Sequence, residues 1–387
     1  MSANVSELPA RRSEPLNIVI LGLSITSSWG NGHATTYRAL IKALDARGHD
    51  VLFLERDAEW YAHNRDLPAP SYCRARIYDS LAALEERFTA NIRSADLVIV
   101  GSYVPEGIAV GDFVLRHARG VTAFYDIDTP VTLARIDAGV DYLAPRQIPR
   151  YDLYLSFTGG PTLDILHDRY GARAPRALYC SVDPDEYRPD PAAPTSCDLG
   201  YLGTFSADRQ PSLDRLMLKA ARLWPEGRFV VAGPTYPSSI SWPSNVKRVE
   251  HLAPGLHRRF YTESRYTLNV TRHDMVRAGY SPSVRLFEAA ACATPIISDT
   301  WPGLEEFFAP ASEILLAHDA RHTLAYLRDM PEADRLATGQ RARVRVLSSH
   351  TSSHRAAELE SYVAEVTRTT HESTGAEAVL SLERTAS

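Results

Sequence analysis

The residues best suited to chemistry lie between positions 280 and 302, which read Y-S-P-S-V-R-L-F-E-A-A-A-C-A-T-P-I-I-S-D-T-W-P. A loop there leads into a predicted helix at 283–292, whose first backbone N–H groups have no partner within the helix and attract a phosphate. The loop and the first helical turn supply the candidate phosphate ligands Ser281, Ser283, Val284 and Arg285. One turn further along, Glu288 has a carboxylate that can accept both hydroxyls of a diol. A phosphate beside a diol predicts a nucleotide, and more specifically a nucleotide sugar.

A glycine-rich loop near the start of the chain supplies a candidate general base. After the first predicted strand the chain reads G-L-S-I-T-S-S-W-G-N-G-H-A-T-T-Y, which includes Gly30, Asn31, Gly32 and His33. A helix that starts at His33 would lower the pKa of the imidazole and keep it neutral, as a base for a hydroxyl requires. The alternative is a loop histidine with structural hydrogen bonds. The dinucleotide fingerprint G-x-G-x-x-G fails because Thr35 replaces its third glycine, which argues against an NAD enzyme.

Two polar clusters follow later strands of the same half. Arg56, Asp57 and Trp60 combine an aromatic ring with hydrogen-bonding groups, which suits a hydroxyl-rich acceptor; the alternative is a self-satisfied salt-bridged loop. Asp126 and Asp128 are two residues apart, so in an extended segment their side chains would share a face. One could act as a base or orient the histidine, and the other could cap the next helix. We assign His33 and Asp126 to catalysis, and to acceptor binding we assign Gly30, Asn31, Gly32, Arg56, Asp57, Trp60 and Asp128.

Strand ends in the second half supply further residues for a phosphorylated ligand. In G-Y-L-G-T-F-S-A-D-R-Q, Gly203 and Thr204 would let a diphosphate approach the backbone. Arg209 and Arg272 follow two strand ends and could neutralise its charge. Gly233 follows another strand end and is placed to form a wall of a base pocket.

Short apolar runs alternate with amphipathic stretches from about residue 16 to residue 347, which predicts strands joined by helices. Strands are expected at 17–21, 50–55, 97–101, 121–125, 152–157, 177–180, 197–202, 229–232, 246–249, 266–270, 295–298 and 313–316. Helices are expected at 33–47, 78–92, 108–118, 160–170, 211–224, 254–264, 283–292, 317–328, 332–347 and 353–366. This order predicts parallel sheets with right-handed crossovers, an α/β fold.

A polar segment with four prolines, D-P-D-E-Y-R-P-D-P-A-A-P-T at 183–195, interrupts the alternation and predicts a linker. Two doubly wound units therefore fit better than one large sheet, and the cleft between them is the expected ligand site. The expected divisions are a disordered N-terminus (1–14), a first Rossmann-like domain (15–185), a linker (186–195), a second such domain (196–350), a helix (351–366) and a flexible tail (367–387).

Composition narrows the class of protein. The chain has 387 residues, 44% of them hydrophobic and 23% charged, as expected for an ordinary globular protein with room for two cores. Its formal net charge of -5 gives no basic footprint, so unmodified nucleic acid is not an expected partner. No apolar run approaches the roughly 18 residues that span a bilayer, and no signal peptide is expected. Four scattered cysteines without metal-ligand spacing predict reduced thiols in a cytoplasmic protein.

Together these motifs resemble the GT-B glycosyltransferases. The F-E-A-A-A-C-A-T-P-I-I element around Glu288 is similar to their donor-binding element. The motifs L-G-L-S-I-T-S-S-W-G-N-G-H-A-T-T-Y-R-A-L, F-L-E-R-D-x-x-W-Y-x-x-N-R-D-L-P, Y-D-I-D-T-P-V-T-L, G-Y-L-G-T-F-S-A-D-R-Q and S-V-R-L-F-E-A-A-A-C-A-T-P-I-I-S-D-T-W-x-G-L-E-E-F-F more closely resemble the CgeB-like (spore-maturation-type) glycosyltransferases, over roughly residues 16 to 347.

The resemblance implies a GT-B fold, with two Rossmann-like domains that face a cleft. It implies an acceptor-facing N-terminal domain, a donor-binding C-terminal domain, and transfer of a hexosyl-type sugar (EC 2.4). It implies a UDP-sugar as co-substrate, with no essential metal and no other cofactor. The resemblance also implies that Glu288 holds the nucleotide ribose. Many retaining relatives carry a further glutamate eight positions before that residue, where this chain has Tyr280. Inverting and retaining outcomes therefore both stay open.

Two other functions are compatible with the same residues. A UDP-sugar epimerase of two-Rossmann architecture could use His33, Asp126 and Asp128 as its acids and bases. A sugar-nucleotide-binding protein without catalysis would need the donor residues alone, and the combination of glycine loop, histidine and glutamate argues against it. The class of the acceptor and the oligomeric state are left open.

Overall fold

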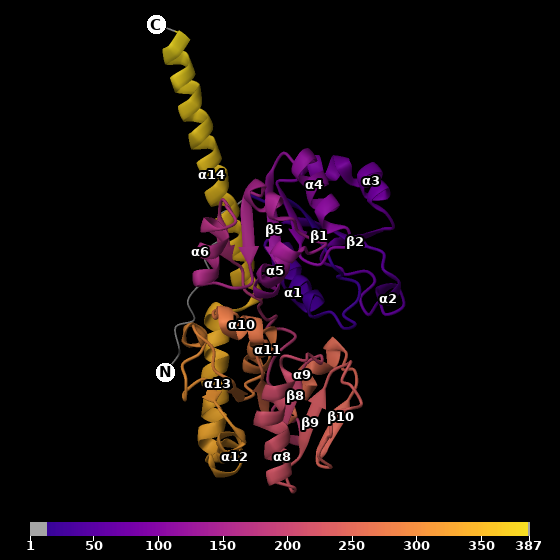
Figure 1. Cartoon of the computed structure of the whole chain (residues 1–387), viewed down its shortest axis with the longest axis vertical. Coiled ribbons are helices and arrows are strands. Elements are labelled where there is room, and N and C mark those ends of the chain that lie inside the picture. Colours follow the sequence, from indigo (N-terminus) through magenta and orange to yellow (C-terminus); the bar gives the residue numbers. More distant parts are fainter. Residues whose placement is uncertain (1–13, 386–387) are drawn as a thin grey trace.

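The computed structural model of the chain describes residues 14–385, with side chains described to residue 369. The described residues form two α/β domains stacked along the long axis of the molecule (Figure 1). The disorder predicted for residues 1–14 falls, apart from Glu14, outside the described residues. The predicted fold class, two Rossmann-like domains with parallel sheets, is confirmed.

The N-terminal domain is built on a parallel sheet of seven strands in the order β3-β2-β1-β4-β5-β6-β7. Its central strands are runs of valine, isoleucine and leucine that are buried on both faces, as helix-covered parallel strands require. The strands are β1 (Asn17–Gly22), β2 (Asp50–Arg56), β3 (Arg74–Tyr78), β4 (Leu97–Gly101), β5 (Val121–Asp126), β6 (Leu153–Ser156) and β7 (Pro175–Ala177). The helices are α1 (Gly32–Ala46), α2 (Glu59–Ala62), α3 (Leu81–Ser94), α4 (Gly107–His117), α5 (Thr129–Arg135) and α6 (Pro161–Asp168), with 3₁₀ turns at Ile136–Ala138 and Pro145–Arg150.

The C-terminal domain repeats this architecture with six parallel strands in the order β10-β9-β8-β11-β12-β13. The strands are β8 (Cys197–Leu202), β9 (Phe229–Ala232), β10 (Val246–Val249), β11 (Ser264–Asn269), β12 (Ile296–Ser298) and β13 (Leu315–Leu316). The helices are α7 (Gln210–Leu213), a π-helical segment (Asp214–Leu218), α8 (Lys219–Leu223), α9 (His257–Thr262), α10 (His273–Ala278), α11 (Val284–Ala291), α12 (Ala320–Asp329) and α13 (Glu332–Ser349), with 3₁₀ turns at Pro254–Leu256 and Leu304–Glu306.

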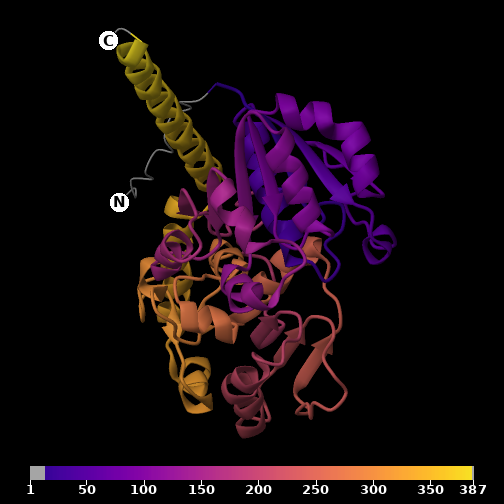
Figure 2. The same cartoon turned by 45° about the horizontal axis from the view of Figure 1, so that its top comes forward.

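The last helix, α14 (Ser352–Thr385), returns to the N-terminal domain and packs along α1 (Figures 1 and 2). Its Glu360 carboxylate accepts hydrogen bonds from Arg47 Nε at 2.5 Å and Nη2 at 2.7 Å, which ties the helix to the end of α1. The helix runs on through residues 367–385, where we expected a flexible tail; residues 386–387 lie outside the described residues.

The two chain crossings between the domains lie side by side. Val182 forms a parallel β-bridge with Thr351, and the Ser352 N–H donates to the Val182 carbonyl at 2.9 Å. The first crossing precedes β8 and the second precedes α14. The two covalent connections between the domains are thus adjacent, and loops at the carboxyl ends of strands in both sheets line the space between the domains.

Candidate functional site

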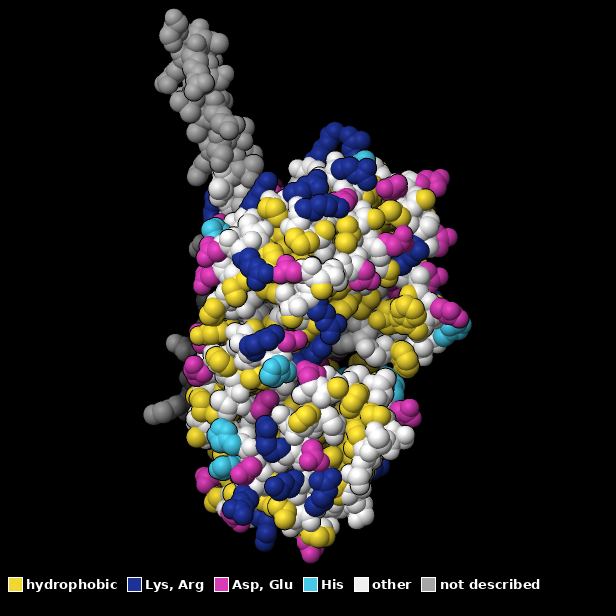
Figure 3. Space-filling view, viewed as in Figure 1, with side chains coloured by type: hydrophobic (Ala, Val, Ile, Leu, Met, Phe, Trp, Pro, Cys, Tyr) yellow, Lys and Arg dark blue, Asp and Glu magenta, His cyan; other side chains and the backbone are white. Residues whose placement is uncertain are grey.

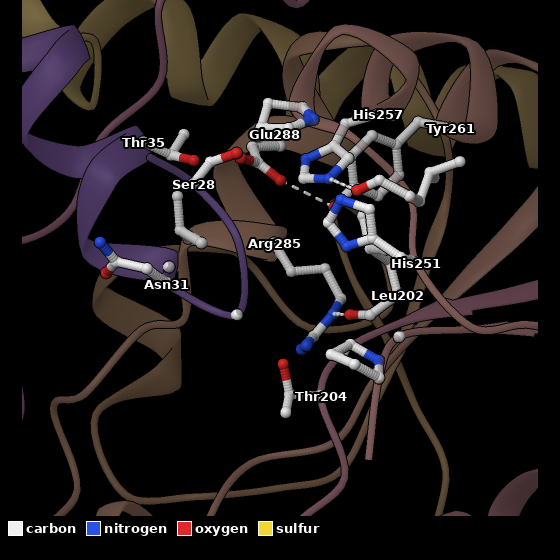
Figure 4. A pocket seen from close by; sticks show the side chains of 18 of the residues that line it. Ser28, Asn31, Thr35, Leu202, Thr204, His251, His257, Tyr261, Arg285 and Glu288 are labelled. Atoms are coloured by element: carbon white, nitrogen blue, oxygen red, sulfur yellow. Dashed lines mark hydrogen bonds between the residues drawn. The ribbon is translucent and has the colours of Figure 1, made fainter. Parts of the chain in front are cut away.

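Two adjoining cavities occupy the space between the domains. The Glu288 cavity is lined mainly by the C-terminal domain, including Gly203, Gly233, Tyr261 and Glu288, and the loop before α1 closes its other side (Figure 4). The His33 cavity is lined by both domains, including His33, Tyr103, Asp128 and Arg272. Residues common to both linings are Gly30, Asn31, Gly32, Arg209, Val284 and Arg285. The two cavities therefore form one continuous cleft, whose mouth is the hollow between the domains in Figure 3.

The N-terminus of α11 points a group of hydrogen-bond donors into this cleft. Ser283 occupies the N-cap position, but its hydroxyl donates to Asn269 Oδ1 at 2.8 Å and does not cap the helix. The N–H groups of Val284 and Arg285, the first two helical residues, have no acceptor within the helix. Both residues line the cleft. The helix start is therefore an uncapped anion site of the kind that binds phosphate.

The Arg285 guanidinium is held rigidly beside that helix start. Its Nε donates to the Leu202 carbonyl at 2.5 Å and its Nη1 donates to Asn269 Oδ1 at 2.9 Å. The guanidinium carbon lies 4.9 Å from the centre of the Tyr201 ring, a cation–π contact. A Cβ added at Gly203 would come within 2.8 Å of Nη2, so the glycine leaves that nitrogen room. A fixed positive charge thus reinforces the positive end of the helix dipole.

Glu288 lies one turn further along α11 with 3% of its surface exposed. Tyr261 donates its hydroxyl to Oε2 at 2.8 Å (Figure 4). Burial, and then the charge of Glu288, raises the pKa of Tyr261 and of Tyr187 well above their usual values, so both phenols stay protonated beside the carboxylate. His251 and His257 line the same end of the cavity. The carboxylate is therefore held in place at the cavity wall, where it can accept hydrogen bonds from a diol.

Two glycine loops form the opposite wall of the Glu288 cavity. Gly233 has a φ of 144°, and a Cβ there would lie 2.1 Å from the Gly203 carbonyl oxygen. Behind them Arg248 donates to the Gly233 carbonyl at 2.8 Å, while its guanidinium carbon lies 4.1 Å from the centre of the Tyr236 ring. The Tyr236 hydroxyl in turn donates to the Gly203 carbonyl at 3.1 Å. These two side chains hold the glycine wall from outside the cavity.

On the N-terminal side, His33 faces the cleft from the start of α1. Its backbone N–H donates to the side chain of the N-cap residue Asn31 at 3.0 Å. Its Nε2 lies 3.7 Å from Asp128 Oδ2, and its Nδ1 is buried without a hydrogen-bond partner among the described residues. The ring packs edge-on against Tyr103, with 5.2 Å between ring centres. Although burial raises the pKa of Asp128, the nearby His33 and the charge of Arg272 outweigh it and lower the pKa.

Asp126, which we predicted to be catalytic, does not line either cavity. It is fully buried, and both of its oxygens accept hydrogen bonds, from Thr132 Oγ1 at 2.9 Å, the Asp128 N–H at 3.2 Å and the Tyr154 hydroxyl at 2.8 Å. Burial raises its pKa to about 6. The carboxylate that faces His33 is that of Asp128, and Asp126 holds the segment that carries it.

Two arginines from the C-terminal domain reach the cleft with donors to spare. Arg209 donates from Nη2 to the Thr204 carbonyl at 2.7 Å, and its Nε is buried without a hydrogen bond in the described part of the chain. Arg272 Nη1 lies 3.9 Å from a carboxylate oxygen of Asp128, and its Nε lies 3.9 Å from one of Asp208. This Nε is also buried without a hydrogen bond in the described part of the chain. Unsatisfied guanidinium donors on a cleft wall favour an anionic ligand.

Some residues predicted for the site lie elsewhere. Ser281 is buried, and its hydroxyl is hydrogen-bonded to Thr158 of the N-terminal domain, so it joins the domains and lines neither cavity. Tyr280 has a φ of 48°, and its ring lies between Gly160 and Gly303, against which it packs so closely that neither glycine has room for a Cβ.

The predicted acceptor residues at and after the end of β2 also lie outside both cavity linings. Arg56 pairs with Glu106 at 3.2 Å, and Asp57 pairs with Arg65 at 2.7 Å. These ion pairs match the salt-bridged loop that we considered as the alternative. Trp60, in α2, is exposed.

Several lining residues were not predicted. Tyr103, in the turn after β4, has a φ of 63°, a conformation that no local sequence signal announces. Tyr261, His251 and His257 reach the Glu288 cavity from α9 and the loop before it. The aromatic pair in R-R-F-Y-T was the one sequence feature that could have indicated Tyr261 as a lining residue, but such a pair is also typical of a helix packed in the core.

Two searches among the described residues were negative. No group of three or more histidine, cysteine, aspartate or glutamate side chains there is arranged to hold a metal ion. None of the described helices combines the length and apolar character needed to cross a membrane.

Comparisons with known proteins agree on the fold. Residues 209–361 match a family model described as Glycosyl transferase-like. A search of curated proteins finds no match to the chain. Among solved structures, sucrose-phosphate synthase from Thermosynechococcus elongatus aligns with 15% identity and a TM-score of 0.63, over 93% of this chain and 100% of that one.

Two structures with bound nucleotide sugar align equally well. Anabaena Alr3699/HepE in complex with UDP-glucose has 13% identity and a TM-score of 0.66, over 92% of this chain and 100% of that one. An alpha-glucosyltransferase in complex with UDP-glucose and DNA containing an abasic site has 14% identity and a TM-score of 0.66, over 91% and 100%. At these identities the likeness concerns the fold, and the predicted GT-B arrangement is confirmed. Membership of the CgeB-like subfamily stays a prediction.

Proposed function

We propose that the protein is a glycosyltransferase that moves a sugar from a UDP-sugar to a hydroxyl-bearing acceptor. The observation that carries this proposal is the single cleft in which an anion-binding helix start, Arg285 and Glu288 face the pair His33 and Asp128. The Glycosyl transferase-like match of residues 209–361 supports it. So does the shared fold of proteins whose structures hold UDP-glucose.

The donor would lie along the C-terminal wall. Its diphosphate would accept hydrogen bonds from the Val284 and Arg285 N–H groups and from the free donors of Arg209 and Arg272. Its ribose hydroxyls would donate to Glu288, and its base would lie against the wall that contains Gly233. With the donor in this order, its sugar would lie in the His33 cavity.

His33 would act as the base for the acceptor hydroxyl. The acceptor oxygen forms a bond to the anomeric carbon, the bond from that carbon to the diphosphate breaks, and His33 takes the hydroxyl proton on its buried, unpartnered Nδ1. Asp128, next to Nε2, would stabilise the imidazolium that results. Arg285, Arg209 and the α11 dipole would stabilise the charge on the departing UDP.

Because these groups already supply positive charge at the diphosphate, we propose that the reaction needs no divalent cation or other cofactor. Chelation with EDTA should leave the rate unchanged, and a loss of rate that Mg²⁺ or Mn²⁺ restores would contradict this part of the proposal. We also propose a cytoplasmic location, which the four free cysteines support.

A nucleotide-sugar panel tests the proposal directly. A donor present at about 100 times its dissociation constant should stabilise the folded chain by about 2.7 kcal/mol, which thermal unfolding detects. Release of UDP that increases when an acceptor is added would support transfer. Conversion of the sugar without an acceptor would indicate an epimerase, and binding without any turnover across a broad acceptor panel would indicate a binding protein.

A further inference from the structure

We infer that the acceptor is an extended carbohydrate, an oligosaccharide or polysaccharide, that stacks on two exposed tryptophans at the rim of the cleft. The inference rests on the proposed function, since it names the acceptor of that same site. It starts from Trp29, which is 42% exposed, and Trp60, which is 56% exposed. We call these two side chains the aromatic rim.

The aromatic rim adjoins the cleft through Trp29. Trp29 directly precedes Gly30, which lines both cavities, and Trp60 lies in α2, beyond either lining. Figure 3 shows hydrophobic side chains gathered on the N-terminal-domain side of the hollow between the domains. A ligand whose hydroxyl reaches His33 and whose other end touches Trp60 must therefore extend out of the cleft.

The two loops that carry these tryptophans are fastened to each other. Ser27 Oγ donates to the Asn64 carbonyl at 2.7 Å, and the Asn64 side chain donates to the Trp60 carbonyl at 2.7 Å. The Leu67 N–H donates to the Thr26 carbonyl at 3.0 Å.

A buried carboxylate also holds the loop that leads to Trp29. Glu55 accepts hydrogen bonds from the backbone N–H groups of Ile25 and Thr26, at 2.8 and 3.0 Å, and from the hydroxyls of Ser24 and Thr26. The rings are therefore presented by a preorganised surface, which lowers the entropy cost of binding.

The charges around the rim disfavour an anionic ligand. Asp57 pairs with Arg65, Asp66 with Arg38, and Glu106 with Arg56. Glu59, exposed next to Trp60 at the start of α2, adds a further acidic side chain. The described rim therefore has no net positive surface for a nucleic acid or an anionic lipid. The paired groups still offer strong hydrogen-bond donors and acceptors, which a purely apolar chain would leave unused.

A sugar ring satisfies both parts of this surface. One face of a pyranose consists of C–H groups, which the electron-rich face of an indole attracts, while its edge carries hydroxyls that hydrogen-bond to charged side chains. Because the rim reaches beyond the cleft, more than one sugar unit is needed to cover it. The geometry thus favours a chain of sugars over a single monosaccharide.

Tryptophan fluorescence in the absence of any donor tests this inference. Neutral gluco- and galacto-oligosaccharides of increasing length should change the emission of the full chain saturably, with affinity that rises with length. Trp29→Ala and Trp60→Ala should each weaken binding about three- to tenfold, since a stacked ring contributes about 0.5–1.5 kcal/mol. Leu223→Ala, which alters an exposed hydrophobic side chain on α8, is the matched control and should bind as the unmodified chain does.

The outcomes separate the inference from the proposed function. Oligosaccharides that bind equally to both tryptophan variants, or that do not bind at all, overturn the inference, as does a response confined to single-stranded DNA or to phosphatidylcholine vesicles. UDP-sugar binding and UDP release without any saccharide response would overturn it while the proposed function stands. If the chain bound saccharides through the rim but bound no UDP-sugar, the role of the rim in carbohydrate binding would be supported and the proposed function refuted.

Discussion

Replacement of Glu288 by glutamine is the change that most directly tests how the cleft binds a nucleotide. The substitution keeps the size and shape of a side chain that is 3% exposed and packed in α11, so it should not create a cavity. It removes the negative charge and converts one of two acceptor oxygens into a donor. Because a buried carboxylate is costly to desolvate, we expect the unliganded variant to unfold at the same temperature as the wild type or a higher one.

The loss of UDP affinity follows from the hydrogen bonds. In the wild type, Tyr261 donates to Oε2 at 2.8 Å and the carboxylate can still accept from a ribose. In glutamine an NH2 group, which can only donate, takes the place of one carboxylate oxygen, so whichever of Tyr261 and the ribose hydroxyl faces that group loses its acceptor. A hydrogen bond to a charged group contributes about 1.5–3 kcal/mol, so UDP should bind about 10- to 150-fold more weakly.

Titration calorimetry with UDP and 2′-deoxy-UDP measures this effect. With the deoxy ligand the gap between wild type and variant should narrow, because the hydroxyl that would lose its acceptor is absent. Glu313→Gln is the control, since Glu313 pairs with Arg345 at 3.0 Å and lines neither cavity. If Glu288→Gln bound UDP as tightly as the wild type, or if the gap were the same for both ligands, the carboxylate would not be the ribose ligand.

Three further substitutions test the proposed base, the support of the glycine wall and a buried carboxylate. His33→Gln should lower kcat about 100- to 10,000-fold and leave UDP affinity unchanged; full activity would rule out the base. In Arg248→Lys, the lysine cannot both donate to the Gly233 carbonyl and stack on Tyr236 as the guanidinium does. The KM for the donor should therefore rise about tenfold while the KM for the acceptor stays unchanged. Equal effects on both KM values would indicate general damage to the protein. Asp126 has its pKa raised from 3.8 to about 6, so the folded state holds the proton more tightly than the unfolded chain. Its contribution should therefore lower the unfolding free energy by about 3 kcal/mol as the pH rises from about 4 to above 6, and Asp126→Asn should lack this slope in urea titrations; an identical pH dependence would contradict the raised pKa.

The positions of the strands could be predicted where apolar runs are long. β1, β2 and β4 each contain four consecutive hydrophobic residues, and their predicted bounds differ from the observed ones by one residue at most. β3 was missed because Arg74–Tyr78 is a short edge strand in which two exposed arginines alternate with Ala75 and Ile77, so it contains no continuous apolar run. Pairing with β2 makes it a strand, and that interaction is not local.

The assignment of the two aspartates shows where sequence reasoning fails within the site. We expected an extended segment in which Asp126 and Asp128 share a face. β5 ends at Asp126, and Asp128 has φ and ψ of −128° and 43°, so the chain turns between them. The turn leaves Asp126 in the core and brings Asp128 to His33. Such a turn depends on hydrogen bonds from Thr132 and Tyr154, which the sequence places far from each other.

The loop before α11 shows why the donor site could be predicted only in part. Its serines and arginine were assigned to a phosphate, and Ser283 and Arg285 do lie on the cleft wall. Ser281, two residues earlier, bonds to Thr158, and the Tyr280 carbonyl accepts from the Gly159 N–H at 3.1 Å, both across the domain boundary. The same short loop therefore fixes the anion-binding helix start and the contact between the domains. A ligand bound at Val284 and Arg285 would therefore lie only three to five residues along the chain from a contact that joins the two domains.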